Sequence, residues 1–533
     1  MNIRVIELER LPAMGETLQT DAEIAPKTER LIHQVEAIRL TANVTLDESR
    51  RSQLGQFMTP SPVAQLMAAM FDDLGGDIHL LDAGAGVGSL TAALIENATT
   101  RKIPPRSITA NTYELEPLLL SHLEKTTALC RETCKQANIS FINRIRPLNF
   151  IEEATSILRG DLFSERIQPR FNRAILNPPY CKVNSASTVR KLLRSVGIET
   201  SNLYTAFVAL AIKLLETDGE LVAITPRSFC NGPYFKPFRE LLLKEMSLTH
   251  IHIFHARNKA FKGDAVLQEN IIFHAIKAKV ASRVLISSST CANDPNIVHR
   301  WIERHEVVNP ADPDLFIHIA TEENDAATTL RVRGLPCSLE DLNIKVSTGR
   351  VVDFRSRKFL RMEPEASTVP LIYPSHFKDG FISWPKLHGR KPNAIIEHAS
   401  TTDLLVPSGM YVLVKRFSSK EERRRIVAAI YDPRRLRKEW VGFENHLNYF
   451  HVDGKGLTRN VAKGLALFLN SSIVDQYFRL FSGHTQVNAA DLRSLRYPSI
   501  RQLKQLGNRI KNKIPDQERI DEIIEETVFS KLL

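Results

Sequence analysis

The chain has 533 residues, a formal net charge of +11 at pH 7, and 43% hydrophobic and 25% charged residues. This length exceeds one ordinary hydrophobic core, so we expect two or three domains. The composition is typical of a folded globular protein and excludes a mainly disordered chain. The charge is uneven, because residues 331–533 hold 35 Lys and Arg against 22 Asp and Glu, whereas residues 1–330 hold 36 against 38. A basic C-terminal part favours a polyanionic partner such as nucleic acid.

Targeting and metal signals are missing from the sequence. No window approaches 18 uninterrupted apolar residues, and the N-terminus lacks the apolar run of a signal peptide, so we expect a cytoplasmic protein. The six cysteines form no C-x-x-C pair. Their spacing favours reduced thiols over disulfides or zinc ligands, and we expect no metal site.

The first half of the chain predicts a helix followed by an α/β domain. Apolar residues at helical spacing over 27–50 predict a helical N-terminal extension, residues 1–50. From about 51 to 280, short apolar runs alternate with helical segments of 10–15 residues. This alternation predicts a mostly parallel, doubly wound, Rossmann-like sheet with helices on both faces, which we place at residues 51–305.

A glycine cluster follows the first predicted strand of this sheet. It reads Asp82-Ala-Gly84-Ala-Gly86-Val-Gly88, and a helix is predicted from Ser89. Glycines let the backbone turn tightly and approach a ligand, and a helix N-terminus adds free N–H groups. The spacing differs from the dinucleotide pattern G-x-G-x-x-G, which disfavours a nicotinamide cofactor. A plain group of turn glycines is the alternative.

Glu114 ends the second predicted strand, within Tyr113-Glu114-Leu115-Glu116-Pro117. An acid in this place can accept hydrogen bonds from ribose hydroxyls in the crevice of such a sheet. A solvated cap is the alternative. The position of Glu114 relative to the glycine cluster is what favours the functional interpretation.

The most specific motif is Asn177-Pro178-Pro179-Tyr180, which follows the predicted strand RAIL. Chance gives this order of residue types about once in 10⁵ positions. An adenine amino group is a weak nucleophile because its lone pair is delocalised into the ring. The Asn177 amide oxygen and the Pro178 carbonyl oxygen can bind its two hydrogens and aim the lone pair at a sulfonium methyl group. The motif therefore favours methylation of an amino group.

The rest of this motif fits the same chemistry. Consecutive prolines fix the local backbone, and Tyr180 offers a face on which a base that has left the duplex can stack. The next residue, Cys181, does not make the Pro-Cys pair used for methylation at a ring carbon. We expect Cys181 to be a small buried residue.

Beyond about residue 285 the strand–helix alternation fades. Residues 306–330 are acidic and loop-like, and we interpret them as a linker. Residues 331–533 mix short strands such as GMYVLVKRF with late helices and hold no detectable repeat. We interpret them as a separate α+β domain.

With its motifs in this order, the chain resembles the gamma-class adenine-N6 DNA methyltransferases. Gln56-Phe57-Met58-Thr59-Pro60 resembles the first cofactor element of that family, and DAGAGVG, YELEP and NPPY follow in the family's order. The resemblance implies a class I methyltransferase sheet that binds S-adenosyl-L-methionine, with Thr59 and Asp82 near the methionine part and Glu114 on the ribose. The expected cofactor-binding residues are Thr59, Pro60, Asp82, Gly84, Gly86, Gly88, Glu114, Asn149 and Phe150.

The chain departs from the family pattern after its third strand. The family normally has Asp-Phe there, and the Asp binds the adenine amino group of the cofactor. This chain has Asn149-Phe150 at the best-fitting place. Asp161 lies nearer to the Asn177-Pro178-Pro179-Tyr180 motif, which we call the tetrad. We favour Asn149 because it follows a strand-like run, and Asp161 stays open as the alternative.

The resemblance also extends to the target base and to DNA recognition. Phe261, before the strand ENIIFHAI, resembles the family's second aromatic against the flipped base, although an ordinary core phenylalanine is the alternative. Segments 346–355, 442–451 and 478–498 resemble the target recognition domain of the PstI/BsuBI-type modification enzymes. The side chains there that suit phosphates and base edges are Arg350, Arg355, His484, Gln486 and Asn488.

The resemblance implies the modification half of a restriction–modification pair. Duplex DNA would be the substrate, a restriction endonuclease the functional partner, and the chain a monomer. The residues do not fix the recognition sequence, for which the resemblance implies CTGCAG. Two alternatives remain: a methyltransferase acting on an RNA or protein amide or amine, and a DNA-binding relative that has lost catalysis. The large basic C-terminal part disfavours the first, and the intact glycine cluster and tetrad disfavour the second.

Overall fold

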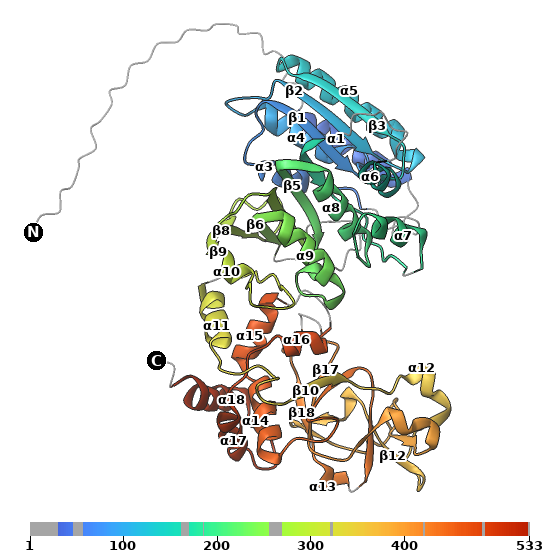
Figure 1. Ribbon diagram of the computed structural model, residues 1–533, viewed down its shortest axis with the longest axis vertical. Helices are drawn as coiled ribbons and strands as arrows, with labels where there is room; N and C mark the ends of the chain where they lie inside the picture. The colour runs from blue at the N-terminus through green and yellow to red at the C-terminus, as the bar shows by residue number, and fades with distance from the viewer. Residues whose placement is uncertain are drawn as a thin grey trace, which may run out of the picture.

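The computed structural model describes residues 30–45, 57–160, 170–184, 186–254, 269–319, 323–418, 422–436, 438–481 and 486–530. Figure 1 shows two lobes stacked along the long axis of the molecule. We call residues 30–319 the N-terminal lobe and residues 323–530 the C-terminal lobe. No helix among the described residues is long and apolar enough to cross a membrane.

A nine-stranded sheet forms the centre of the N-terminal lobe, in the order β3-β2-β1-β4-β5-β7-β6-β8-β9. Strands β1 to β5 are parallel, and β7 runs antiparallel between β5 and β6. The sheet confirms the predicted doubly wound α/β class. Its strands are β1 (Asp77–Ala83), β2 (Ser107–Tyr113), β3 (Ser140–Arg146), β4 (Phe171–Leu176), β5 (Leu215–Pro226), β6 (Met246–Phe254), β7 (Asn270–Lys277), β8 (Arg283–Ser289) and β9 (Val298–Glu303).

Helices cover both faces of this sheet because its central strands are apolar on both sides. Neighbouring residues such as Leu80 and Leu81 belong to two different buried clusters, one with α3 and α4 and the other with α6, α8 and α9. The covering helices are α3 (Ser61–Ala69), α4 (Ser89–Thr99), α5 (Pro117–Gln136), α6 (Phe150–Arg159), α7 (Thr188–Ser195), α8 (Leu203–Leu214) and α9 (Lys236–Glu245).

The predicted N-terminal helix is present as α1 (Leu31–Thr45), and the rest of residues 1–50 lies outside the described residues. Ile32 and Val35 are fully buried in the cluster that contains α4. Leu40 is 52% exposed and lies outside the buried face of this helix.

The C-terminal lobe contains two small sheets and a group of helices. One sheet has the order β10-β20-β17-β18-β14-β13, and the other β11-β15-β12-β19-β16. Their longer strands are β10 (Lys345–Thr348), β12 (Thr368–Ile372), β17 (Tyr411–Lys415), β18 (Ala428–Tyr431), β19 (Trp440–Phe443) and β20 (Leu447–His451). Their shorter strands are β11 (Leu360–Arg361), β13 (Phe377–Lys378), β14 (Phe381–Ile382), β15 (Ala394–Ile396) and β16 (Leu405–Pro407).

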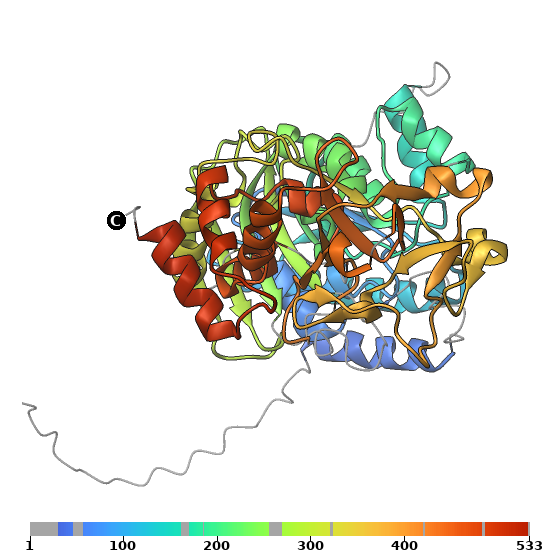
Figure 2. The same ribbon diagram turned by 90° about the horizontal axis from the view of Figure 1, so that it is seen from below.

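The helices lie to one side of the strands when the lobe is seen from below (Figure 2). They are α14 (Arg459–Leu469), α15 (Ser472–Phe481), α16 (Ala489–Arg493), α17 (Ile500–Asn508) and α18 (Gln517–Ile524). Helices α14 and α17 touch backbone to backbone. A Cβ on Gly464 would lie 1.9 Å from the Leu503 carbonyl oxygen, and one on Gly507 would lie 1.9 Å from that of Asn460. Only glycine fits this crossing.

The predicted linker, residues 306–330, contains regular structure and buried apolar residues. It includes the end of α10 (Arg304–Val307) and the first part of α11 (Glu323–Arg333). Phe316, Ile317 and Ile319, which come between these helices in the chain, are buried. The loop-like character expected for 306–330 was therefore wrong over these stretches. The acidic composition hid the apolar residues that the two lobes bury.

Candidate active site

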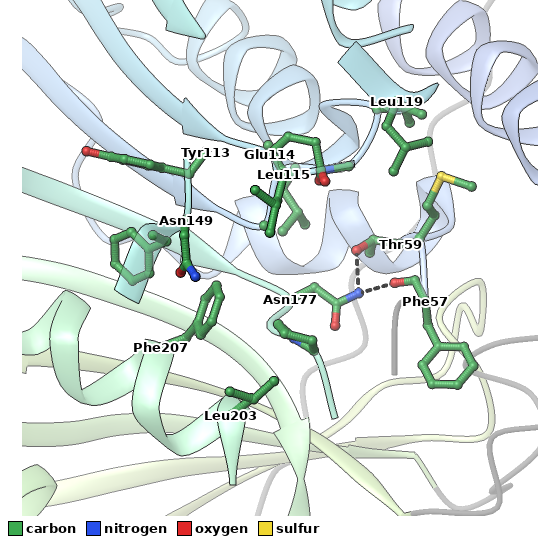
Figure 3. Close-up of a pocket in the computed structure, with 18 of the residues that line it drawn as sticks. Phe57, Thr59, Tyr113, Glu114, Leu115, Leu119, Asn149, Asn177, Leu203 and Phe207 are labelled. Atoms are coloured by element: carbon green, nitrogen blue, oxygen red, sulfur yellow. Dashed lines mark hydrogen bonds between the residues drawn. The ribbon is translucent and has the colours of Figure 1, made fainter. Parts of the chain in front are cut away.

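A cavity of about 260 Å³ opens at the carboxyl ends of strands β1 to β4 (Figure 3). Parallel strands bring the residues that follow them to one edge of a sheet, which is where ligands bind in folds of this type. The predicted site residues that line it are Thr59, Gly84, Gly86, Glu114, Asn149, Phe150, Asn177 and Pro179. Segments separated by more than 100 residues therefore meet in one pocket.

The glycine cluster forms one wall of the cavity. Gly84, Gly86 and Gly88 have φ of +80°, +58° and +87°, a region that favours glycine. The turn is fixed to the next strand, because the amides of Gly84 and Ala85 both donate to the Tyr113 carbonyl oxygen at 2.9 Å. The predicted role of these glycines in a tight turn that approaches a ligand fits this geometry.

Glu114 lies in the cavity wall beside the glycine turn. Its carboxylate accepts hydrogen bonds from the amides of Gly86 at 2.8 Å and Glu116 at 2.7 Å. Burial raises the pKa of Glu114, and these two amides oppose that shift. A carboxylate held in this way keeps lone pairs that can accept from a pair of ribose hydroxyls.

Asp82, near the end of β1, is fully buried and is not among the residues that line the cavity. Its Oδ2 accepts from the Thr91 hydroxyl at 2.7 Å, whereas its Oδ1 has no partner. Burial raises the pKa of Asp82 to about 7. A buried acceptor without a partner is costly, so this carboxyl fits a site whose ligand carries positive charge.

Asn149 and Phe150 form the opposite wall. Asn149 is the N-cap of α6, since its Oδ1 accepts from the Ile151 amide at 3.0 Å, and Phe150 packs edge-on against Tyr113 at 5.2 Å. An amide oxygen has two acceptor positions, so the cap leaves one for a ligand. Asp161, the alternative, lies outside the described residues, as do Gln56 and Phe261.

Asn177 follows β4, and two fixed acceptors orient its side-chain amide. Its Nδ2 donates to the Phe57 carbonyl oxygen at 2.7 Å and to the Thr59 hydroxyl at 2.9 Å, as Figure 3 shows. A backbone carbonyl can only accept, so the amide cannot turn its oxygen toward Phe57. The Asn177 Oδ1 therefore points away from these residues, toward Tyr180, whose hydroxyl lies 3.3 Å from it.

The Tyr180 ring lies among other aromatic rings. Its ring centroid lies 6.2 Å from that of Phe57 and 6.0 Å from that of Tyr204, in an edge-to-face arrangement with Tyr204. The ring centroids of Tyr204 and Phe235 are 5.7 Å apart. Burial raises the pKa of Tyr180 strongly, so its hydroxyl stays protonated. Pro178, the second residue of the tetrad, is buried.

Several cavity residues were not predicted. Phe57, Leu203 and Phe207 line the pocket, and Phe207 packs against Phe150 at 5.1 Å. The last two come from α8, whose sequence shows only an apolar face. No local signal distinguishes a residue on that face that lines a cavity from one in the core.

The DNA-contact residues predicted in the C-terminal lobe differ in their surroundings. Arg350 and Arg355 are exposed, Gln486 is half-buried, and His484 lies outside the described residues. Asn488 is the N-cap of α16, in a capping box with Asp491. The Asn488 side chain therefore stabilises the start of its own helix.

No cysteine is among the described residues that line the cavity. All six cysteines are free, and Cys181 is half-buried, with its pKa raised by burial. Among the residues that the structure describes, no group of three or more His, Cys, Asp or Glu side chains could hold a metal ion.

The strand order, with β7 antiparallel between β5 and β6, and the glycine turn, Glu114 and the Asn-Pro-Pro-Tyr tetrad at one edge define a class I, S-adenosylmethionine-dependent methyltransferase. The model of the Eco57I restriction-modification methylase family matches residues 107–261. The chain is 49% identical to the type II methyltransferase M.PstI of Providencia stuartii, over 93% of this chain and 96% of that protein. It is 44% identical to the type II methyltransferase M.BsuBI of Bacillus subtilis, over 94% and 99%.

The chain therefore belongs to the family of type II methyltransferases that contains M.PstI and M.BsuBI, which confirms the resemblance seen in the sequence. A solved structure of the type IIL restriction-modification enzyme MmeI in complex with DNA is also similar. Its TM-score is 0.50 at 11% identity, over 93% of this chain and 74% of that one, so it supports the fold.

Proposed function

We propose that the chain transfers a methyl group from S-adenosyl-L-methionine to the N6 atom of an adenine that has left duplex DNA. The observation that carries this proposal is the fixed orientation of the Asn177 amide. With its Nδ2 engaged, its Oδ1 is the atom presented beside Tyr180. An acceptor at this position suits an exocyclic amino group, which brings two hydrogens.

The cofactor fits the residues of the cavity. Glu114 would hold the ribose hydroxyls, the glycine turn would let the backbone approach the ligand, and Phe150 would cover the purine. Asn149 would accept from the cofactor's amino group. Asp82, buried near the end of β1, has an unpartnered Oδ1, and positive charge from the cofactor would stabilise its ionised form. When bound, S-adenosyl-L-methionine supplies an electrophilic methyl group.

The target base would stack on Tyr180, with Phe261 as the proposed second aromatic. Asn177 Oδ1 and the Pro178 carbonyl oxygen would accept the two N6 hydrogens and direct the nitrogen lone pair at the methyl carbon. The N6–methyl bond forms as the sulfur–methyl bond breaks, and the extra proton on N6 passes to water. Neither a nucleophilic cysteine nor a metal is needed for these steps.

We further propose that residues 51–305 perform the transfer and residues 331–533 bind the duplex, joined by 306–330. The basic excess of residues 331–533 supports this division. The activity would protect cytoplasmic DNA from a partner restriction endonuclease, with the enzyme acting as a monomer. An RNA or protein amide methyltransferase is disfavoured because the relatives at 49% and 44% identity, over more than 90% of the chain, are type II methyltransferases.

Single-molecule sequencing of DNA from cells that express the chain tests the proposal. The host should lack its own adenine methylation. We expect N6-methyladenine at every copy of one short sequence, and none in cells that express Asn177→Ala. Methylcytosine in place of N6-methyladenine would contradict the assigned target atom.

A further inference from the structure

Three strand ends meet at one edge of the six-stranded sheet in the C-terminal lobe. Strand β20 pairs with β10 and β17 in antiparallel register, Thr348 opposite Asn448 and Lys415 opposite Leu447. The ends of β10 and β17 therefore lie beside the start of β20. The residues that follow or precede these ends are Arg350, Arg416, Phe417, Asn445 and His446. Residue 486 joins them, since Gln486 forms an antiparallel bridge with Phe417.

This edge is tied to the N-terminal lobe through α16. The Val487 amide, just before that helix, donates to the Arg416 carbonyl oxygen at 2.7 Å. Within α16, Asp491 Oδ1 lies 3.5 Å from Asn231 Nδ2 of the N-terminal lobe. The segment that holds Asn231 continues into the short helix η2 (Pro233–Phe235), where Phe235 packs on Tyr204.

The same segment of the N-terminal lobe also reaches the Asn177–Tyr180 tetrad. Tyr204, on which Phe235 packs, contacts the Tyr180 ring as well. A second contact between the lobes involves Arg227, which donates to the Leu480 carbonyl oxygen. Residues 227–235 therefore link the lobe that carries Arg416 to the aromatic rings around Tyr180.

Arg416 is the positioned cation of this edge. Its Nη1 donates to the Asn445 carbonyl oxygen at 2.7 Å and its Nη2 approaches Gln486 Oε1 at 3.4 Å, while its guanidinium lies over the Phe417 ring. These contacts occupy two of the five N–H groups of a guanidinium. By contrast, Arg355 is exposed, and its guanidinium lies only over the ring of Phe354, which is itself exposed. A cation held in a fixed direction suits base recognition better than contact with a flexible backbone phosphate.

We propose that Arg416 determines sequence specificity by reading the O6 and N7 atoms of a guanine close to the target adenine. A guanidinium fits these two acceptors in the major groove with two parallel hydrogen bonds. Asn445 and Gln486 are positioning residues, because they hold the guanidinium. This inference rests on the proposed function, since it needs a methylated adenine as the reference point.

The experiment compares the methylated motif of four enzymes: the unaltered chain, Arg416→Gln, Arg416→Lys and, as a control of equal charge change, Arg501→Gln on the exposed side of α17. Each is expressed in a host without adenine methylation, and its motif is read by single-molecule sequencing. We expect Arg416→Gln to lose discrimination at one guanine by roughly 5- to 150-fold, the value of one bidentate pair. The Arg501→Gln motif should be unchanged.

A second measurement uses the unaltered enzyme, so that a folding defect in a variant cannot obscure the result. Each guanine of the motif is replaced in turn by 7-deazaguanine, which lacks the N7 acceptor, in a synthetic duplex. We expect one replacement to lower kcat/KM, and Arg416→Lys to be less sensitive to that same replacement.

Three outcomes overturn the inference. One is an unchanged motif in Arg416→Gln with uniformly fewer methylated sites, which indicates a phosphate or structural contact. Another is full activity of the unaltered enzyme on all the 7-deazaguanine duplexes. The third is equal sensitivity of the unaltered enzyme and Arg416→Lys. Absence of N6-methyladenine with the unaltered chain would instead contradict the proposed function.

Discussion

The two lobes place their polar groups in different ways. In the N-terminal lobe, most of the predicted site residues in the pocket belong to contiguous motifs at the ends of parallel strands, such as the glycine turn after β1 or the tetrad after β4. In the C-terminal lobe, the polar edge combines residues 350, 416, 446 and 486, which approach only after three strands pair. Chemistry carried by a local motif is visible in sequence, whereas a surface assembled from distant segments is not.

The largest effect should come from Asn177→Ala. This variant tests whether Asn177 binds the target amine and takes no part in binding the cofactor. We expect kcat to fall on the order of 100-fold or more, as when a single positioned hydrogen-bonding group is removed from a catalytic site. The cofactor dissociation constant, measured by calorimetry, should change little. Near-normal turnover would show that the acceptor lies elsewhere in the pocket.

Two variants of Tyr180 distinguish the stacking role of its ring from the hydrogen bonding of the same motif. Tyr180→Ala should weaken base binding by about 1–3 kcal/mol, the range for one base–aromatic stack, whereas Tyr180→Phe keeps the face and should be mild. Fluorescence of 2-aminopurine at the target position reports the flipped base. Equal behaviour of the two variants would exclude a stacking role.

A substitution at the crossing of α14 and α17 should destabilise the C-terminal lobe without a direct effect on the N-terminal lobe. Gly464→Ala pushes a Cβ into the Leu503 carbonyl oxygen and should cost about 1–3 kcal/mol of stability, as overpacking does. Thermal unfolding measures this cost, with the exposed Lys504→Ala on α17 as control. DNA binding should weaken while cofactor binding persists. Parallel loss of both would mean that the lobes fold as one cooperative unit.

Much of the fold and pocket was predictable because local physics determines it. The glycine turn, Glu114 and the tetrad lie where their strand order predicts, and residues of opposite parity on β1 face opposite layers. Phe207 and Arg416 were not predictable, because burial and long-range pairing give them their surroundings. The loop-like prediction for 306–330 was wrong in part for the same reason. Acidic residues flank Phe316 and Ile317 in the sequence, and these two side chains are buried only when the lobes are assembled.

Asp82 gives the N-terminal lobe a pH dependence. Its folded pKa of about 7 lies above the usual aspartate pKa of 3.8, so the unfolded chain releases the proton first as pH rises. The stability of the cofactor-free protein should therefore fall between about pH 4 and pH 7, with a slope of up to about 1.4 kcal/mol per unit. Denaturant unfolding of Asp82→Asn at pH 5 and pH 7 checks this. A slope identical to that of the unaltered chain would reject it.

The smallest effect concerns Asn149, which both caps α6 and lines the cavity. Asn149→Ala should cost about 1 kcal/mol of stability through the lost cap and should also raise the cofactor dissociation constant. Asn149→Ser keeps a capping oxygen and should restore stability while cofactor binding stays weak. If Asp161→Ala weakens cofactor binding more than either variant, the amine contact belongs to Asp161.

The proposed mechanism is tested by a structure of the enzyme with a non-reactive cofactor analogue and an unmethylated duplex that contains its recognition sequence. We expect an adenine outside the helix, its ring against Tyr180 and its N6 within about 3 Å of the Asn177 Oδ1 and the Pro178 carbonyl oxygen. A cytosine in that pocket, or an adenine whose N6 faces neither acceptor, would contradict it.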